Sequence, residues 1–224
     1  MILFIVFFIP ATKNLNNDYF LLRQRMVEEQ IIKRGISDSA VINAMLEVKR
    51  HLFVPDKFRT SAYEDHPLPI GQDQTISQPY IVALMTELLQ VDKNQKILEV
   101  GTGSGYQAAI LSLLADSVFT IEIIPELAAS AKERLNRLGY KNVVVKTGDG
   151  YKGWAEHSPF DGIIVTCAPD EVPSLLLEQL AIGGRMVIPV GSYYQELLLI
   201  TKDSSGTSGK SIVPVKFVPM IKGD

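Results

Sequence analysis

Apolar and polar residues alternate at helical spacing through the first third of the chain, with one irregular stretch between the helical patterns. From Tyr19 to Arg34, apolar positions recur every three or four residues among charged ones. Gly35 follows, and glycine commonly ends a helix. Prolines and a glycine mark the irregular stretch. The pattern predicts a helix over 19–34, a second helix capped by Ser37 or Asp38, a loop region over 60–78 and a third helix over 79–89.

From residue 97 onward, short apolar runs alternate with helical patterns. Such runs are typical of strands buried on both faces, and their alternation with helices predicts a doubly wound α/β fold with a mostly parallel sheet. The last two runs flank a turn rich in serine and glycine, which indicates an antiparallel hairpin. The predicted strands are 97–100, 118–122, 143–147, 162–166 and 185–190, the helices are 105–115, 126–138 and 172–180, and the hairpin joins 196–201 to 212–217 through 203–209.

The composition is that of a globular protein, with 46% hydrophobic and 21% charged residues in a chain of 224. This length suits one α/β domain with an appendage. We expect residues 19–92 to form a helical and loop substrate region that packs on a core of residues 93–224 in one compact domain. The net charge of −3 and the lack of a basic run disfavour nucleic acid as a partner. Only one cysteine, Cys167, and no histidine cluster are present, so we expect no metal site.

Residues 1–18 form a separate apolar extension, interpreted as a possible signal or tail. Residues 2–9 are all apolar, but the run is too short to span a bilayer as a helix, and no lysine or arginine precedes it. An export signal, a buried strand and a start codon assigned too far upstream remain open. We expect a cytoplasmic monomer without stable membrane insertion; the alternative is export to the periplasm, with residues 1–11 as the signal.

The first strand of the regular half runs into three alternating glycines, Gly101, Gly103 and Gly105. Glycines between a strand and a helix expose backbone N–H groups and allow a ligand close to the main chain. A dinucleotide site requires glycine or alanine at the next position, where this chain has Tyr106. With Glu99 before them, the glycines resemble motif I of methyltransferases that use S-adenosylmethionine (AdoMet). Glu99 would lower the potential around the sulfonium or bind the cofactor through its backbone; the alternative for Glu99 is a strand-end ion pair. For the glycines, the alternative is a tight turn without a ligand.

Three further strand ends carry groups that suit the same cofactor. Ligands of open α/β sheets lie beyond the carboxyl ends of the strands. Glu122, with Ile123 after it, ends the second strand about 20 residues beyond the first glycine, where an acid binds both ribose hydroxyls. Asp149 and Gly150 follow the third strand, where a carboxylate accepts from the adenine amino group. Thr166 ends the fourth.

Two sequence runs upstream of the glycines resemble one family, whereas the glycine motif is shared by many families. His66-Pro-Leu-Pro-Ile-Gly71 and Gln74-Thr-Ile-Ser-Gln-Pro-Tyr80 are similar to the substrate-side signature of the protein-L-isoaspartate O-methyltransferase family. The resemblance covers roughly residues 20 to 220 in one order. It departs from the family at Gln72-Asp73, where a glycine-containing pair is usual, and at Lys216, where arginine is frequent. Further matching segments are 25–30, 50–55, 148–150, 160–166, 171–173, 183–185 and 217–219.

The resemblance implies a class I methyltransferase fold and a reaction. AdoMet would methylate the free carboxylate of L-isoaspartyl residues in damaged proteins and peptides, and the ester would start repair through a succinimide. A carboxylate with a pKa near 4 is already ionised at neutral pH, so no base is needed. Ser77 is expected at the reacting carboxylate and also in contact with the cofactor, with Gln74, Thr75 and Ile76 shaping the loop over the cofactor. Capping of the helix that begins near Pro79 is the alternative for Ser77.

Two rival functions remain open from the sequence. A methyltransferase for a small-molecule hydroxyl would need a base, and only His66 or Asp73 could serve. An AdoMet-binding module without catalysis would act through protein contacts. Amino-group methylation of DNA is disfavoured because Cys167-Ala-Pro-Asp170 stands where those enzymes carry an Asn/Asp-Pro-Pro-Tyr/Phe tetrapeptide.

Overall fold

The computed structural model describes residues 15–223. The predictions for the apolar run at the N-terminus, the export signal among them, lie outside the described residues. Within the described part, no helix combines the length and the apolar character needed to cross a membrane.

The N-terminal helix is longer and less regular than predicted. It begins at α1 (Leu15–Met26), continues through a π-helical turn (Val27–Ile31) and a 3-10 turn (Ile32–Arg34), and ends at Gly35. Gly35 has a φ of 97°, in the left-handed region that favours glycine. The prediction over 19–34 is therefore confirmed in type and in its end, but the helix starts four residues earlier.

Two further helices complete the N-terminal region. Asp38, one of the two predicted caps, begins α2 (Ser39–Glu47), because its side chain accepts hydrogen bonds from the backbone of Ala40 and Val41 at 2.8 and 3.3 Å. The third predicted helix is confirmed as α3 (Pro79–Leu89). Short 3-10 turns occupy Arg50–Leu52 and Asp56–Ser61.

The prediction of a loop over 60–78 is wrong in part, because this stretch contains a small antiparallel hairpin. Its strands are β1 (Leu68–Gly71) and β2 (Gln74–Ile76). Gln72 and Asp73 form the turn with φ values of 52° and 54°. A type I′ turn requires positive φ at both central residues, and such positions normally take glycine or asparagine. The prolines and the absence of such residues hid the hairpin from the pattern.

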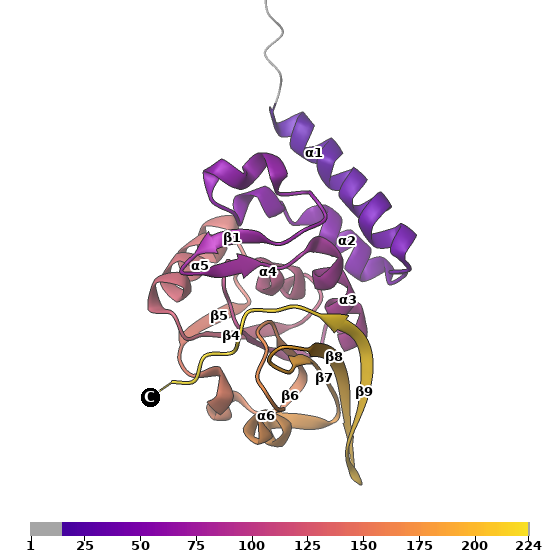
Figure 1. Cartoon of the computed structure of the whole chain (residues 1–224), viewed down its shortest axis with the longest axis vertical. Helices are drawn as coiled ribbons and strands as arrows, with labels where there is room; N and C mark the ends of the chain where they lie inside the picture. The colour runs from indigo at the N-terminus through magenta and orange to yellow at the C-terminus, as the bar shows by residue number, and fades with distance from the viewer. Residues whose placement is uncertain (1–14, 224) are drawn as a thin grey trace, which may run out of the picture.

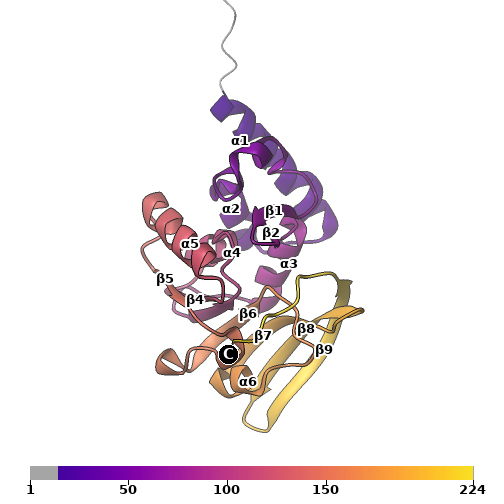
Figure 2. The same ribbon diagram turned by 60° about the vertical axis from the view of Figure 1, so that its left-hand side comes forward.

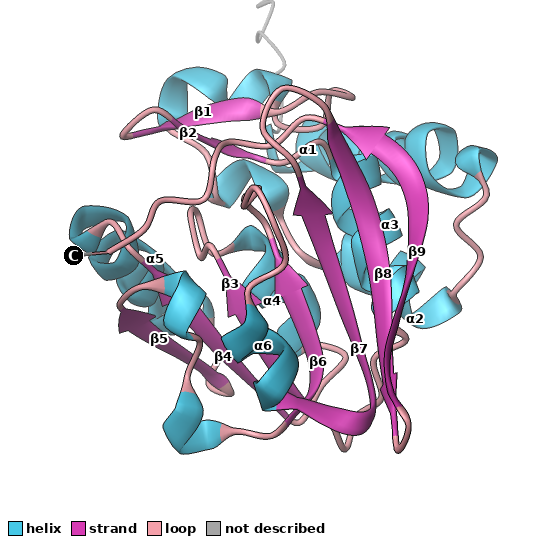
Figure 3. Ribbon diagram, turned by 60° about the horizontal axis from the view of Figure 1, so that its bottom comes forward, coloured by secondary structure: helices cyan, strands magenta, loops and turns pink. Residues whose placement is uncertain are grey.

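The main sheet has seven strands in the order β5-β4-β3-β6-β7-β8-β9. The first five in this order are parallel, and β8 and β9 add an antiparallel hairpin at one edge (Figure 3). The predicted fold class is confirmed. The strands are β3 (Lys96–Val100), β4 (Ser117–Glu122), β5 (Val143–Thr147), β6 (Phe160–Val165), β7 (Leu180–Val190), β8 (Gln195–Asp203) and β9 (Gly206–Val215).

Several element ends differ from the predicted ones. The helix predicted over 105–115 is α4 (Tyr106–Ser112), and that over 172–180 is α6 (Ser174–Gln179), after which β7 begins at once. The helix α5 (Pro125–Leu138) is close to its prediction. The turn between β8 and β9 is tighter than predicted, because the Asp203 side chain accepts from the backbone of Ser205 and Gly206 and closes it.

Apolar side chains cover both faces of the sheet. On one face, Ile97 and Ile164 belong to a buried cluster that also contains Met26 and Phe53 of the N-terminal region. On the other face, Leu98 of β3 packs in a second cluster with residues of β6, β7 and α6. Figures 1 and 2 show α1, α2 and the β1–β2 hairpin gathered at one end of the molecule, above the sheet. The carboxyl ends of β3, β4 and β6 therefore face this region.

Candidate active site

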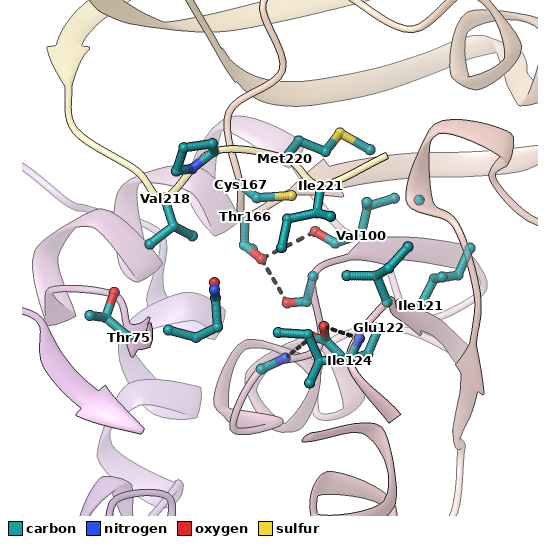
Figure 4. Close-up of a pocket in the computed structure, with 16 residues that line it drawn as sticks. Thr75, Val100, Ile121, Glu122, Ile124, Thr166, Cys167, Val218, Met220 and Ile221 are labelled. Atoms are coloured by element: carbon teal, nitrogen blue, oxygen red, sulfur yellow. Dashed lines mark hydrogen bonds between the residues drawn. The ribbon is translucent and has the colours of Figure 1, made fainter. Parts of the chain in front are cut away.

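The glycine loop between β3 and α4 takes backbone conformations that side chains disfavour. Gly101, Gly103 and Gly105 have φ values of 98°, 51° and 83°. A Cβ on Gly101 would lie 2.4 Å from the Thr166 Oγ1. The Thr166 hydroxyl instead donates toward the carbonyl oxygens of Val100 and Gly101, at 3.1 and 2.7 Å (Figure 4). The end of β6 thus fastens the loop, and only glycine fits at its first position.

Glu122 at the end of β4 holds the other side of this loop. Its Oε2 accepts from the backbone N–H of Gly103 at 2.8 Å, and its Oε1 accepts from that of Ile124 at 3.0 Å (Figure 4). The residue is 5% exposed. A carboxylate has about four acceptor positions, so two remain for a ligand. Because both oxygens are fixed by backbone donors, Glu122 presents an oriented pair of acceptors.

A pocket lies against the glycine loop and Glu122, and its remaining walls are largely apolar. Gly150 forms part of one wall, where a Cβ would lie 2.4 Å from Val100 Cγ1 and 3.0 Å from Met220 Cε. Only glycine therefore fits there, because the Val100 and Met220 side chains occupy the space that a Cβ would take. The lining residues are Gln74, Thr75, Val100, Gly101, Gly103, Ile121, Glu122, Ile123, Ile124, Gly150, Thr166, Cys167, Val218, Pro219, Met220 and Ile221. We call this the cofactor pocket.

Eight of the thirteen residues predicted to bind the cofactor line this pocket. The five that do not are Ile76, Ser77, Glu99, Gly105 and Asp149. Ile76 is 4% exposed and its side chain belongs to the core, because neighbours on a strand face opposite sides and Thr75 faces the pocket. Gly105 serves packing, since a Cβ there would lie 3.1 Å from the Leu135 side chain of α5. The eight are Gln74, Thr75, Gly101, Gly103, Glu122, Ile123, Gly150 and Thr166.

Asp149 is next to the pocket but is not among its lining residues. Its Oδ1 accepts from the backbone N–H of Tyr151 at 2.9 Å and caps the 3-10 turn Gly150–Lys152. Lys152 Nζ lies 3.7 Å from its other oxygen. In this structure the Asp149 carboxylate therefore fixes the turn that begins at Gly150.

Glu99 points away from the pocket into the core. It lies between Leu98 and Val100, whose side chains are on the opposite face of the sheet. It is completely buried, and neither carboxylate oxygen has a hydrogen-bond partner among the described residues. Burial raises the pKa of Glu99 to about 8. The predicted direct role beside the cofactor therefore has no geometric support.

A second, larger hollow of about 790 Å³ adjoins the cofactor pocket. The two share Thr75, Thr166, Val218 and Pro219 as lining residues. Ser77 lines only the second hollow, which we call the acceptor hollow. The other lining residues are Pro67, Gln78, Ile81, Pro214, Val215, Lys216 and Phe217.

The Ser77 hydroxyl forms no hydrogen bond with another described residue. The N-cap position of α3 is taken by Gln78, and no side chain makes a capping hydrogen bond there. The capping alternative for Ser77 is therefore wrong. The half-buried hydroxyl is available to a ligand in the acceptor hollow.

The C-terminal segment lines the site, although no motif in the sequence predicts a role for it there. Residues 216–221, which we call the terminal strap, leave β9 and run back across the upper edge of the sheet (Figure 3). The backbone N–H of Ala168 donates to the Val218 carbonyl at 2.9 Å, and that of Met220 donates to the Ala168 carbonyl at 2.8 Å. The strap lines both the cofactor pocket and the acceptor hollow. Residues 218–221 are all apolar, follow the strand predicted over 212–217 and belong to no predicted element, and this was the signal that could have found the strap.

The described residues offer neither a reactive thiol nor a metal-binding cluster at this site. Burial raises the pKa of the Cys167 thiol to about 12, with a further contribution from the charge of Glu122, so the thiol is neutral and serves as a wall. Among residues 15–223, no group of three or more histidine, cysteine or acidic side chains is arranged to hold a metal ion. The site instead combines fixed acceptors, hydroxyl groups and apolar walls.

Comparisons with known proteins agree on one family. The family model described as protein-L-isoaspartate(D-aspartate) O-methyltransferase matches residues 22–224. A protein-L-isoaspartate O-methyltransferase of Picosynechococcus sp. is 54% identical over 199 residues, covering 89% of this chain and 90% of the relative. One of Geobacter metallireducens is 52% identical over 206 residues, covering 91% and 95%.

Two solved structures that resemble this chain are described as members of the same family. A protein-L-isoaspartate O-methyltransferase structure aligns with a TM-score of 0.80 at 33% identity, over 88% of this chain and 65% of the solved one, which is longer. A structure from Plasmodium falciparum, described as a putative enzyme of this kind in complex with S-adenosyl-L-homocysteine, aligns with a TM-score of 0.79 at 27% identity, over 90% and 99%. The chain therefore belongs to the protein-L-isoaspartate(D-aspartate) O-methyltransferase family.

Proposed function

We propose that this chain transfers a methyl group from AdoMet to the free carboxylate of L-isoaspartyl residues in damaged proteins and peptides, and so starts their repair through a succinimide. One observation carries the proposal beyond family membership. A pocket built on the glycine loop opens beside a larger hollow. In that hollow lies a half-buried serine, Ser77, whose hydroxyl has no hydrogen-bond partner among the described residues. This is the arrangement that transfer between two bound molecules requires.

The residues of the cofactor pocket fit AdoMet. Glu122 retains acceptor positions for two ribose hydroxyls, and the glycines leave the backbone accessible. The apolar walls near Gly150 suit the adenine ring. When bound, AdoMet supplies a methyl group on a positively charged sulfur. The task of the protein is then to hold the acceptor in line and to exclude water.

The acceptor hollow suits a substrate that arrives already ionised. None of its lining residues among the described chain is a histidine or a carboxylate, so no general base faces it. Lys216 is its one formally charged lining residue and favours an anion. Ser77 donates a hydrogen bond to one carboxylate oxygen and leaves the other free to attack. Thr75 and Thr166 line the boundary where the two molecules meet.

The rival function, methylation of a small-molecule hydroxyl, has less support than methylation of an isoaspartyl carboxylate. His66, one of its two candidate bases, is exposed and lies 2.9 Å from both Glu64 and the carbonyl of its neighbour Pro67. Asp73, the other, is exposed in the hairpin turn. Neither lines the acceptor hollow.

A matched pair of peptides tests the function. The protein is incubated with methyl-labelled AdoMet and a peptide that contains either L-isoaspartate or L-aspartate at one position. We expect base-labile label only in the isoaspartyl peptide. Equal labelling of both peptides would contradict the proposal. AdoMet binding without labelling of either would favour the module without catalysis.

The cytoplasmic location and the monomeric state stay predictions from the sequence. Cell fractionation of the full chain, beside a chain that starts at Leu15, checks the location and the role of the apolar N-terminus. Light scattering after gel filtration checks the mass in solution, for which a monomer of 24.8 kDa is expected.

A further inference from the structure

The first residue of β8 makes an unusual pair of hydrogen bonds to the terminal strap. The side-chain amide of Gln195 accepts from the backbone N–H of Phe217 at 2.6 Å and donates to the carbonyl of the same residue at 3.1 Å. Gln195 is 6% exposed, so the amide is largely shielded from water. Both backbone polar groups of Phe217 are therefore held by one side chain.

These two hydrogen bonds continue the pairing of the two chain segments beyond the end of the β8–β9 ladder. The last backbone pair of the two strands is Gln195 with Val215. Two residues further on, the Gln195 amide presents the same donor and acceptor to Phe217 that a peptide group of β8 would have presented. The strap thereby leaves β9 in a defined direction although no strand continues beside it.

The strap has separate anchors for its two ends. Its distal part is bound to the Ala168 backbone through Val218 and Met220, and this part lines the cofactor pocket. Its proximal part, Lys216 and Phe217, lines only the acceptor hollow. Gln195 holds this proximal part.

We propose that Gln195 is a positioning residue for substrate recognition, which fixes the wall of the acceptor hollow formed by Lys216 and Phe217 without touching either reactant. The assignment of a peptide to that hollow rests on the proposed function. Loss of the Gln195 amide would free the proximal strap while the distal strap stays bound. Peptide binding should therefore weaken more than cofactor binding.

Two variants of Gln195 test this. Gln195→Leu removes both hydrogen bonds at similar volume, and Gln195→Glu keeps the acceptor but sets a carboxylate against the Phe217 carbonyl. In each, we expect KM for an isoaspartyl peptide to rise about tenfold, as the loss of one or two neutral hydrogen bonds implies. The Kd for AdoMet should stay within about twofold of the wild type. Thr201→Ala is the matched control, because it removes an exposed side-chain hydrogen bond to Ser208 between the same strands at their far end.

Hydrogen exchange supplies a readout that does not depend on activity. The amide of Phe217 should exchange at least about tenfold faster in Gln195→Leu than in the wild type, with little change at Met220. Unchanged exchange and KM would overturn the proposal, and so would an equal loss of peptide and AdoMet affinity. If the wild type does not methylate the peptide at all, the proposed function fails; faster exchange at Phe217 alone would still support the anchor, and unchanged exchange would overturn it.

Discussion

At the scale of single residues, most polar side chains of this site bind the backbone, and few are free for a ligand. Thr166 and Glu122 hold the glycine loop, and Asp149 caps the turn at Gly150. Ser77 differs, because it lies in the acceptor hollow without a bond to another described residue. Substitution should therefore separate residues that build the site from those that meet the substrate.

Ser77→Ala tests whether Ser77 is one of the residues that contact the substrate. If the hydroxyl orients the acceptor carboxylate, its loss should lower kcat about 100-fold, comparable to removal of one oriented donor in other enzymes. The Kd for AdoMet should change less than about twofold, since Ser77 does not line the cofactor pocket. Steady-state kinetics and calorimetry measure the two. Near-normal turnover would remove Ser77 from the mechanism; Ser158→Ala, in a surface turn, is the control.

Because the pKa of Glu99 is raised in the folded chain, we expect the free energy of unfolding to depend on pH. Burial raises its pKa from 4.5 to about 8 in the folded chain. Between these values the folded chain holds a proton that the unfolded chain has released, so a rise in pH favours unfolding. The stabilisation is complete below about pH 4.5 and is lost as pH rises to about 8, at about 1.4 kcal/mol per pH unit.

Glu99→Gln should remove this dependence. Urea unfolding at pH 5.5 and 7.5 should show a smaller difference for the variant than for the wild type, and the variant should be the more stable of the two at pH 7.5. Glu178→Gln, at an exposed carboxylate, should leave the difference unchanged. Parallel pH profiles for wild type and Glu99→Gln would contradict the assignment.

At the scale of elements, the long apolar patterns were predictable and the short irregular elements were not. The apolar runs of β3 to β6 and the amphipathic pattern of α5 each fit only one type of element, and the structure confirms that type. The β1–β2 hairpin was missed because its strands have four and three residues and its turn lacks glycine. Ile76 and Gly105 were assigned to the site by motif alone, which does not tell which face a residue takes.

The hairpin turn carries strain that glycine should relieve. Gln72 has a φ of 52°, a conformation that costs a non-glycine residue about 1–2 kcal/mol. Glycine also costs about 0.5–1 kcal/mol of unfolded-chain entropy, so Gln72→Gly should gain about 0.5–1 kcal/mol net. That corresponds to a rise in Tm of about 1–4 °C by calorimetry. The same exchange at Gln24, exposed in α1, should instead lower Tm; a lower Tm for Gln72→Gly would refute the argument.

At the scale of the whole molecule, the site joins distant parts of the chain. The cofactor pocket takes residues from the β1–β2 hairpin, from the ends of β3, β4 and β6, and from the terminal strap. The parallel core and its ligand edge could be predicted, because alternation of strands and helices fixes where the carboxyl ends lie. The strap could not, because its place depends on Ala168, about 50 residues earlier in the chain.

Removal of the strap should affect both ligands. A chain that ends at Val215 lacks the residues that wall both hollows, so AdoMet affinity and peptide affinity should each fall more than about tenfold, as expected when several buried contacts are lost. Circular dichroism should show that the sheet remains, and a chain that ends at Ile221 is the control. Retained affinity for either ligand would show that the strap is not needed there.

The wall that the two hollows share has a thermodynamic consequence. Val218 and Pro219 face both. A ligand that moves these residues on entering one hollow changes the shape of the other, so the two binding equilibria are linked, and each ligand alters the affinity for its companion by the same factor. The enzyme can thus favour the ternary complex over either binary one through a few residues near its C-terminus.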